Sequence, residues 1–144
     1  MTNVQARSAR PPIHLLAAES DFIADLALNI EQRQPVVAAM LLEEIERAEL
    51  HDPDTIPAGH VRLGSTVDFV DEKTGEPRQV KLVLPAHADI GQGRVSILTP
   101  MGAALYGLAA GQKIDWPDLF GNPRTIRIVR VADPEEERAY SPAA

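Results

Sequence analysis

The stretch Val95-Ser-Ile-Leu-Thr-Pro-Met-Gly-Ala-Ala-Leu-Tyr-Gly107 decides the fold of this chain. It predicts a strand over residues 94–98 that is followed at once by a helix. Thr99 suits the N-cap of that helix and Pro100 its first position, because a first turn leaves its N–H groups unpaired and proline has none to lose. The helix, Met101 to Leu108, is rich in glycine and alanine. So slim a helix is expected to lie close against a sheet.

Segments with the two-residue alternation of strands lie on both sides of this helix. The predicted strands are 66–70, 79–84, 94–98, 113–116 and 125–131, with turns at 73–76 and 120–123 and a loop at 85–93. Because helical periodicity is confined to the N-terminal third and the slim helix, this order of elements predicts an α+β fold.

Two helices are expected before the first strand. Ser20 or Asp21 is a candidate N-cap for a helix that ends near Arg33. Gln34-Pro35 then breaks the helix, since proline disfavours helical geometry in the residue before it yet suits a new first turn. The second helix is expected over 35–50, and so tight a break favours an antiparallel hairpin. A single helix kinked at the proline is the alternative.

Apolar residues mark the inward faces of these helices at three- and four-residue spacing. In the second helix, Glu43 and Arg47 are spaced as a surface ion pair. The apolar positions are Phe22, Ile23, Leu26 and Ile30 in the first helix and Val37, Met40, Leu41, Ile45 and Ala48 in the second.

The chain is expected to divide into five parts. Residues 1–18 form a mobile lead that contains Pro11-Pro12, and 19–50 form the helical hairpin. Two prolines and a glycine make 51–59 a linker. Residues 60–132 form the sheet-bearing body, and 133–144 an acidic tail.

Charge is spread unevenly over these parts. The net charge of the 144 residues is −7. Residues 19–50 hold eight acids against two bases, a net −6, whereas 60–132 hold seven acids against nine bases, a net +2. Neither part has the clustered cations that displace counterions from phosphate, so direct nucleic-acid binding is not expected.

Composition favours a soluble cytoplasmic protein. Apolar residues make up 44% and charged residues 24%, as in ordinary globular domains. The absence of cysteine excludes disulfides and thiolate sites. No apolar run approaches the roughly 20 residues that span a bilayer, and no signal-peptide pattern is present. No membrane association is expected.

Nothing in the sequence indicates catalysis, a metal or a cofactor. His14, His51, His60 and His87 fall in four separate segments without helical metal-ligand spacing, and each is expected to be a surface or linker residue. Nucleophile elbows, phosphate-binding loops and dinucleotide fingerprints are missing as well. The protein is therefore expected not to be an enzyme.

The segment from Val95 to Trp116 resembles the C-terminal domain of the transcript-cleavage factors GreA and GreB, through its strand, Thr-Pro turn, slim helix and Gly111. Gly64 to Thr74 is similar to that domain's first strand and turn. The resemblance covers residues 60–132. It implies an FKBP-like fold, a twisted antiparallel sheet crossed by one helix.

The resemblance also implies a partner. Gre factors dock on RNA polymerase at the rim of its secondary channel, and their docking turn corresponds to Leu98, Thr99 and Pro100, with Met101 beside them. DNA or RNA would be contacted only indirectly, through polymerase. In Gre factors a long coiled coil also carries acidic residues that hold a catalytic magnesium ion.

At the expected hairpin tip this chain offers one acid, Glu31, next to Arg33, which is a poor ligand set for magnesium. Helices of about 15 residues also reach only about 22 Å, short of a channel-length probe. Transcript cleavage is therefore expected to be absent. A short hairpin before a Gre-type domain resembles instead the regulators of nucleoside diphosphate kinase, which implies a regulator of transcription elongation.

Two other functions remain as alternatives. An FKBP-like fold is compatible with peptidyl-prolyl isomerase activity, although the body has few aromatic residues to line a pocket. The protein could also be an interaction scaffold unrelated to polymerase, which binds its partner through the hairpin residues Val37, Leu41 and Ile45. Contact with the first helix is the simpler interpretation of that stripe.

Overall fold

The computed structural model describes residues 12–117, 120 and 122–134, and the predicted lead before residue 12 and the tail beyond 134 lie outside these. The elements are β1 (His14–Leu16), α2 (Ala17–Ile30), α3 (Pro35–Arg47), β2 (Glu49–His51), β3 (Thr66–Asp71), β4 (Pro77–Val83), β5 (Arg94–Ser96), α4 (Pro100–Leu105), β6 (Lys113–Pro117) and β7 (Pro123–Ala132). Short 3-10 turns at Pro85–His87 and Ile90–Gln92 connect β4 to β5. No helix within the described residues is long and apolar enough to cross a membrane.

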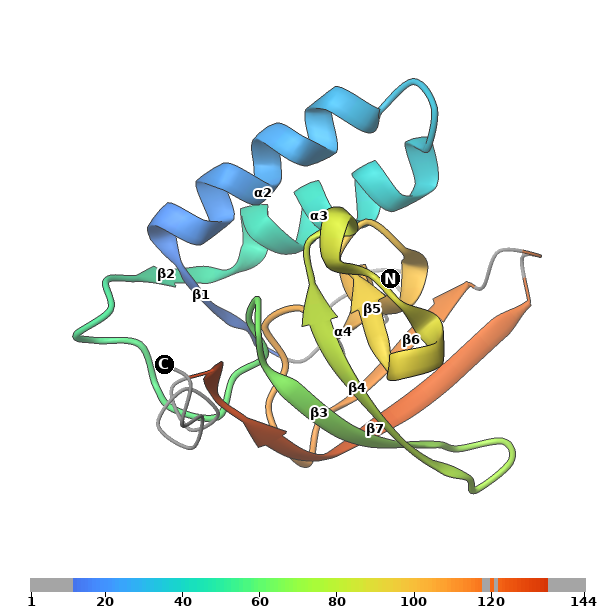
Figure 1. The fold of residues 1–144 in the computed structure, drawn as a ribbon. Helices are drawn as coiled ribbons and strands as arrows, with labels where there is room; N and C mark the ends of the chain where they lie inside the picture. Colours follow the sequence, from blue (N-terminus) through green and yellow to red (C-terminus); the bar gives the residue numbers. More distant parts are fainter. Residues whose placement is uncertain (1–11, 118–119, 121, 135–144) are drawn as a thin grey trace, which may run out of the picture.

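The N-terminal helices form an antiparallel pair, as predicted, and not one kinked helix (Figure 1). The backbone N–H groups of Arg33 and Gln34 both donate to the carbonyl of Ile30, at 3.0 and 2.7 Å, which closes α2. Pro35 then starts α3. Each helix ends about three residues earlier than predicted, and after α3 the chain extends to form β2.

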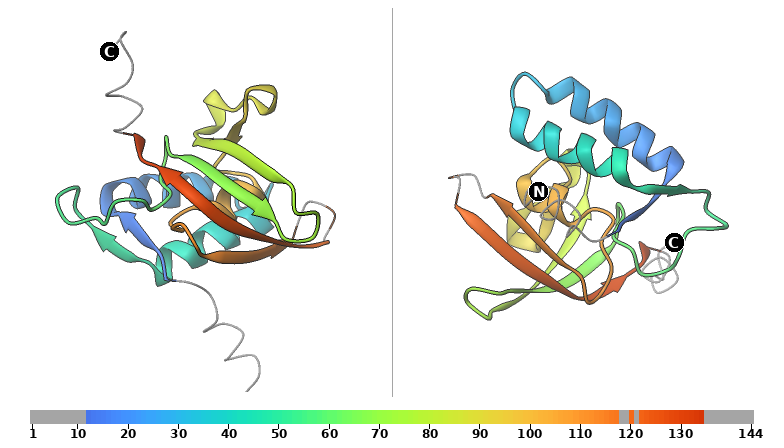
Figure 2. Two further views of the ribbon diagram at one scale, coloured as in Figure 1. Left: turned by 90° about the horizontal axis from the view of Figure 1, so that it is seen from below. Right: turned by 180° about the vertical axis from the view of Figure 1, so that it is seen from behind.

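The helix pair covers one side of a five-stranded sheet with the order β5-β4-β3-β7-β6 (Figures 1 and 2). Four of these strands pair antiparallel, as predicted. The expectation of a wholly antiparallel sheet was wrong at one edge, where β5 runs parallel to β4. The reason is the connection between them. Its 3-10 turns and Gly93, at φ +73°, bring the chain back beside Lys81, so that β5 runs in the same direction as β4.

The expectation of a mobile lead up to residue 18 was wrong for its last part. Ile13 and Leu15 are among the most buried side chains, and β1 pairs in parallel with β2. Helix α2 begins at Ala17, and Ser20, predicted as a cap, instead donates its hydroxyl to the carbonyl of Ala17. The two prolines do favour an extended chain, but the apolar residues after them draw that extended chain into the core.

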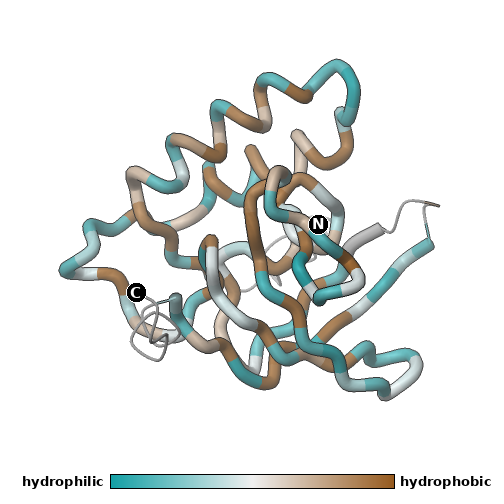
Figure 3. The backbone as a smooth tube through the Cα atoms, in the orientation of Figure 1, coloured by the Kyte–Doolittle hydropathy of each residue, from teal (hydrophilic) through white to brown (hydrophobic). Residues whose placement is uncertain are grey.

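Helix pair and sheet share one hydrophobic core. Of the predicted apolar positions of the helices, Ile23, Ile30, Val37 and Leu41 belong to it, whereas Phe22 is 48% exposed. Figure 3 shows the hydropathy alternating along both helices, with the α2–α3 turn and the β3–β4 turn hydrophilic. Because the inward stripe of α3 is buried, the hairpin packs as a layer on the body.

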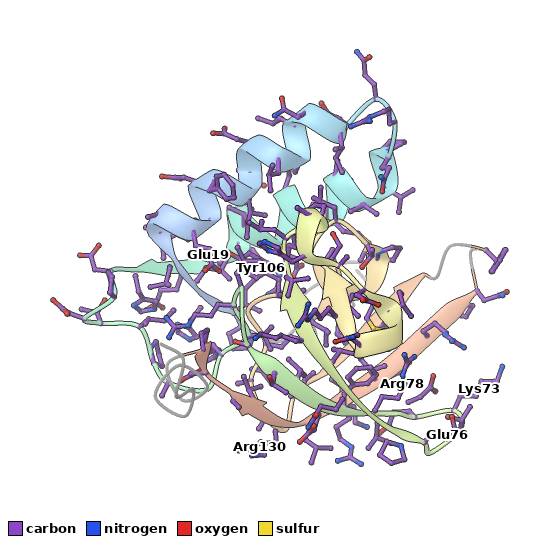
Figure 4. The ribbon with its side chains drawn as sticks, in the orientation of Figure 1. Glu19, Lys73, Glu76, Arg78, Tyr106 and Arg130 are labelled. Carbon is purple, nitrogen blue, oxygen red and sulfur yellow. The ribbon has the colours of Figure 1, made fainter. Side chains whose placement is uncertain are left out.

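A carboxylate is partly buried where α2 meets the body. Glu19 accepts a hydrogen bond of 3.1 Å from the backbone N–H of Leu63. It lies beside the hydroxyl of Tyr106, although the two do not form a bond of standard geometry (Figure 4). Burial raises the pKa of Glu19, against the lowering effect of its hydrogen bonds. Burial, followed by the Glu19 charge, raises the pKa of Tyr106 strongly.

Glu19→Gln is expected to remove the free-energy cost of this partly buried charge. The pKa of Glu19 in the folded chain is raised above its ordinary value of 4.5. Ionisation of Glu19 therefore lowers the free energy of unfolding as the pH rises from the pKa of the unfolded chain to that of the folded chain. The variant should match the wild type near pH 4 and exceed its free energy of unfolding at pH 7, measured by urea titration. Glu31→Gln, at the exposed tip, is the control. A difference that does not vary with pH would contradict this account.

Candidate docking surface

The turn from β5 into α4 has the capped geometry that the sequence predicts. The hydroxyl of Thr99 accepts a 3.0 Å bond from the backbone N–H of Gly102 and donates a 2.7 Å bond to the carbonyl of Ser96. Pro100 occupies the first position of the helix. The helix itself is shorter than predicted and ends at Leu105.

Gly102 is required by how closely α4 approaches this turn. A Cβ atom at this position would lie 2.1 Å from the carbonyl oxygen of Ser96 and 2.9 Å from the Cα of Ile97. Both contacts are with backbone, which cannot rotate away. The side chains of the turn are therefore held in a fixed place relative to the sheet.

A groove of about 630 Å³ opens in front of this turn. Four segments line it: β4, the loop before β5 together with β5, the start of α4, and the region where β6 turns into β7. Its lining residues are Arg78, Gln79, Val80, Ala88, Ile90, Gly93, Arg94, Val95, Ser96, Thr99, Pro100, Met101, Phe120 and Arg124. Ile90 and Phe120 leave 77% and 89% of their surface exposed, more than the other exposed large apolar side chains of the described residues, and both lie at this one groove.

The groove is cationic as well as apolar. Three arginines, Arg78, Arg94 and Arg124, stand around it, and no acidic residue is among its described lining residues. Apolar anchors set among arginines are typical of protein-binding surfaces, where aromatic residues and arginine are enriched. The arrangement suits an acidic protein surface with an apolar centre.

Three of the four residues predicted to dock lie at this groove. Thr99, Pro100 and Met101 line it, whereas Leu98 is half-buried and packs against the core. Sequence reasoning did not identify Ile90 or Phe120. Their position in turns was the available signal, because an apolar residue in a turn has no strand or helix partner to bury it.

The predicted hairpin-tip residues lie elsewhere. Glu31 and Arg33 are both exposed in the turn between α2 and α3, and neither lines the groove. At the other end of α3, the predicted surface position of Arg47 is only partly exposed, and its guanidinium donates two bonds to the buried carboxylate of Glu44.

The histidines depart from the expectation of isolated surface residues. His14, His51 and His60 lie together and are each partly buried, while His87 is exposed. Burial lowers the pKa of His60, whose Nδ1 lies 3.0 Å from the carbonyl oxygen of Gly107. The sequence spacing of His14, His51 and His60 does not predict this group. The pairing of β1 with β2 and the position of residue 60 in the folded chain bring the three side chains together.

A helix pair on a five-stranded sheet is an architecture found in a class of transcription elongation factors. Residues 56–133 match the family model described as transcription elongation factor, GreA/GreB, C-terminal. The chain belongs to the GreA/GreB family.

Relatives support this over most of the chain. Transcription elongation factor GreA of Brucella anthropi is 33% identical over 131 residues, covering 85% of this chain and 83% of the relative. GreA of Methylobacterium sp. is 33% identical over 114 residues, covering 74% and 72%. A solved prokaryotic GreA/GreB factor from Nitrosomonas europaea is 35% identical with a TM-score of 0.67, covering 84% of this chain and 99% of that one.

Gly102→Ala is expected to lower the free energy of unfolding by about 3 kcal/mol, because the new methyl group overlaps the Ser96 carbonyl. Gly91→Ala is the control, since the nearest atom to its new methyl group is 3.5 Å away. That change should stay within about 0.5 kcal/mol of the wild type in the same urea titration. Equal effects of the two substitutions would show that the close approach does not govern stability.

Proposed function

We propose that this protein binds RNA polymerase near its secondary channel and regulates transcription elongation without stimulating transcript cleavage, as a factor of the nucleoside diphosphate kinase regulator type in the cytoplasm. The observation that carries the proposal is the groove in front of Thr99 and Pro100, with its exposed Ile90 and Phe120. The proposal assigns no catalytic residue to this chain.

The composition of the groove supports docking on a protein. Burying a large apolar side chain contributes about 1.5–3 kcal/mol, so Ile90 and Phe120 together offset part of the free-energy cost of association. The surrounding arginines add orientation and speed of encounter with an acidic partner. Leu98 contributes from beneath by supporting the turn, since it packs against the core.

The hairpin supports the absence of cleavage. Helix α2 has 14 residues, which span about 21 Å, and its inner face is occupied by the shared core. The tip offers the single carboxylate Glu31 with Arg33 close in sequence. A magnesium ion prefers several oxygen ligands with compensating negative charge, so these tip residues do not fit the catalytic ion of Gre factors.

Charge supports indirect contact with nucleic acid. The helix pair carries most of the negative charge of the chain, which repels phosphate. The arginines of the groove are interleaved with exposed apolar side chains, and this mixture suits a protein more than a phosphate backbone.

The two alternative functions gain little from the structure. Phe120 is the one aromatic among the described lining residues of the groove, so the aromatic pocket that prolyl isomerisation needs is not formed there. The stripe Val37, Leu41 and Ile45 packs against the core, which leaves it closed to a scaffold partner.

Binding to purified core RNA polymerase tests the docking surface. Ile90→Ser combined with Phe120→Ser is expected to weaken binding at least about tenfold, because both side chains are exposed anchors. Leu28→Ser, which is 55% exposed on α2, is the matched apolar control and should bind like the wild type. Excess GreA should displace the wild-type protein. No polymerase binding by the intact protein, or no displacement by GreA, would overturn the assignment.

Charge reversal provides a separate measure of the same surface. Arg78→Glu with Arg94→Glu should slow association with polymerase, and the difference from the wild type should shrink at high salt. Lys73→Glu with Arg130→Glu, at two exposed positions outside the groove, changes the net charge by the same amount and is the matched control (Figure 4). Equal losses for groove and control variants would mean that only net charge matters.

The absence of cleavage has its own assay. Added to stalled elongation complexes, the protein should leave the length of the RNA unchanged, whereas GreA should shorten the RNA from its 3′ end. It should also reduce the shortening by GreA when present in excess, because both need one docking site. RNA shortening by this protein alone would refute the non-cleaving assignment and leave the docking surface untouched.

A further inference from the structure

Three potential metal ligands meet at the base of the helix pair. The register of the β1–β2 pair sets His14 opposite Glu49 and Leu16 opposite His51. The Nδ1 atom of His14 lies 2.9 Å from Nε2 of His51. The Oε2 atom of Glu49 lies 3.3 Å from that Nε2 and 4.0 Å from Nδ1 of His14. Two imidazole nitrogens and one carboxylate oxygen thus form a small triangle.

This triangle has the dimensions of one face of a tetrahedral metal site. Zinc binds histidine nitrogen and carboxylate oxygen at about 2.0–2.2 Å, which sets tetrahedral ligand atoms roughly 3.3–3.6 Å apart. Of the three observed separations, one lies at the lower limit of that range, one is shorter and one is longer. Shifts of a few tenths of an ångström at the side-chain ends would bring all three atoms onto one ion.

A neighbouring group favours the tautomer of His51 that such an ion needs, and the ion would displace the proton shared between His14 Nδ1 and His51 Nε2. Thr55 Oγ1 lies 3.4 Å from Nδ1 of His51, so a proton on that nitrogen has an acceptor nearby while Nε2 stays free to bind. The ring of His60 stands 4.6 Å from that of His14 and borders the site. His51 is 12% exposed at its side chain and Glu49 67%, which leaves an entry path along Glu49.

We infer that His14, Glu49 and His51 form a binding site for a single divalent transition-metal ion of the zinc type. Two imidazoles and a carboxylate, with a fourth position open to water, are a ligand set that suits zinc and disfavours magnesium and calcium, which prefer oxygen. This site is separate from the docking groove and does not depend on the proposed binding of polymerase.

The ion would join parts that the sequence leaves far apart. His14 precedes α2 and His51 follows α3, so one ion would close the open end of the helix pair. Such a link stabilises the folded chain because the unfolded chain cannot present both histidines together. The site is therefore expected to tune the stability of the helix pair.

Metal titration of the untagged, chelator-treated full-length protein tests the inference. Zn²⁺ is expected to bind with a stoichiometry of one in competition with a chromophoric chelator, and to raise the Tm. Co²⁺ should give the intense visible absorption of a tetrahedral ion, whereas Mg²⁺ should change neither observable. No zinc binding, or a stoichiometry above one without a change in Tm, would overturn the site.

Variants distinguish this site from scattered histidines. His14→Gln and His51→Gln should each weaken Zn²⁺ binding by more than about tenfold, and Glu49→Gln should do so without unfolding the chain, because Glu49 is mostly exposed. His87→Gln is the control, since His87 lies in an exposed turn of the β4–β5 connection. Unchanged binding in Glu49→Gln and in both ligand histidine variants would show that the histidine pair is only a hydrogen-bonded contact.

Discussion

The close approach of α4 to the turn before it is the constraint on which the structure depends. Because Gly102 has no side chain, the helix backbone can contact the carbonyl of Ser96. The hydroxyl of Thr99 links the two by donating to that carbonyl and accepting from the N–H of Gly102. With α4 held there, its buried residues pack between α3 and the sheet, where α4 contacts β6. The same turn carries the side chains that line the groove, so stability and the candidate site share one origin.

Much of this could be predicted from the sequence, because its signals are local. The capped turn before α4, the alternating strands β3 and β7 and the break at Pro35 each rest on a few neighbouring residues, and all were predicted correctly. β1 was missed because three residues cannot establish a period, and its burial depends on contact with Gly107. β5 was predicted as a strand, but its parallel direction was missed because strand direction depends on the path of the preceding loop.

The candidate site was predictable only in part, for a related reason. Thr99, Pro100 and Met101 are contiguous and carry a family pattern, whereas Phe120, Ile90 and the arginines come from separate segments. A groove of this kind is a property of the tertiary fold. The histidine group was even less predictable, because His14 and His51 are 37 positions apart and meet through two strands that are too short to detect in the sequence.

The pairing of β3 with β7 has a consequence for how the chain is made. Thr66 pairs with Ala132, so the centre of the sheet joins residues that leave the ribosome far apart in time. At about 5–20 residues per second, roughly 3–13 s separate their synthesis. During that interval the two helices can pack on each other and β3 can pair with β4. The edge of β3 that later pairs with β7 stays unpaired. The polar turns and charged residues along this hairpin then protect the nascent chain against pairing with another copy.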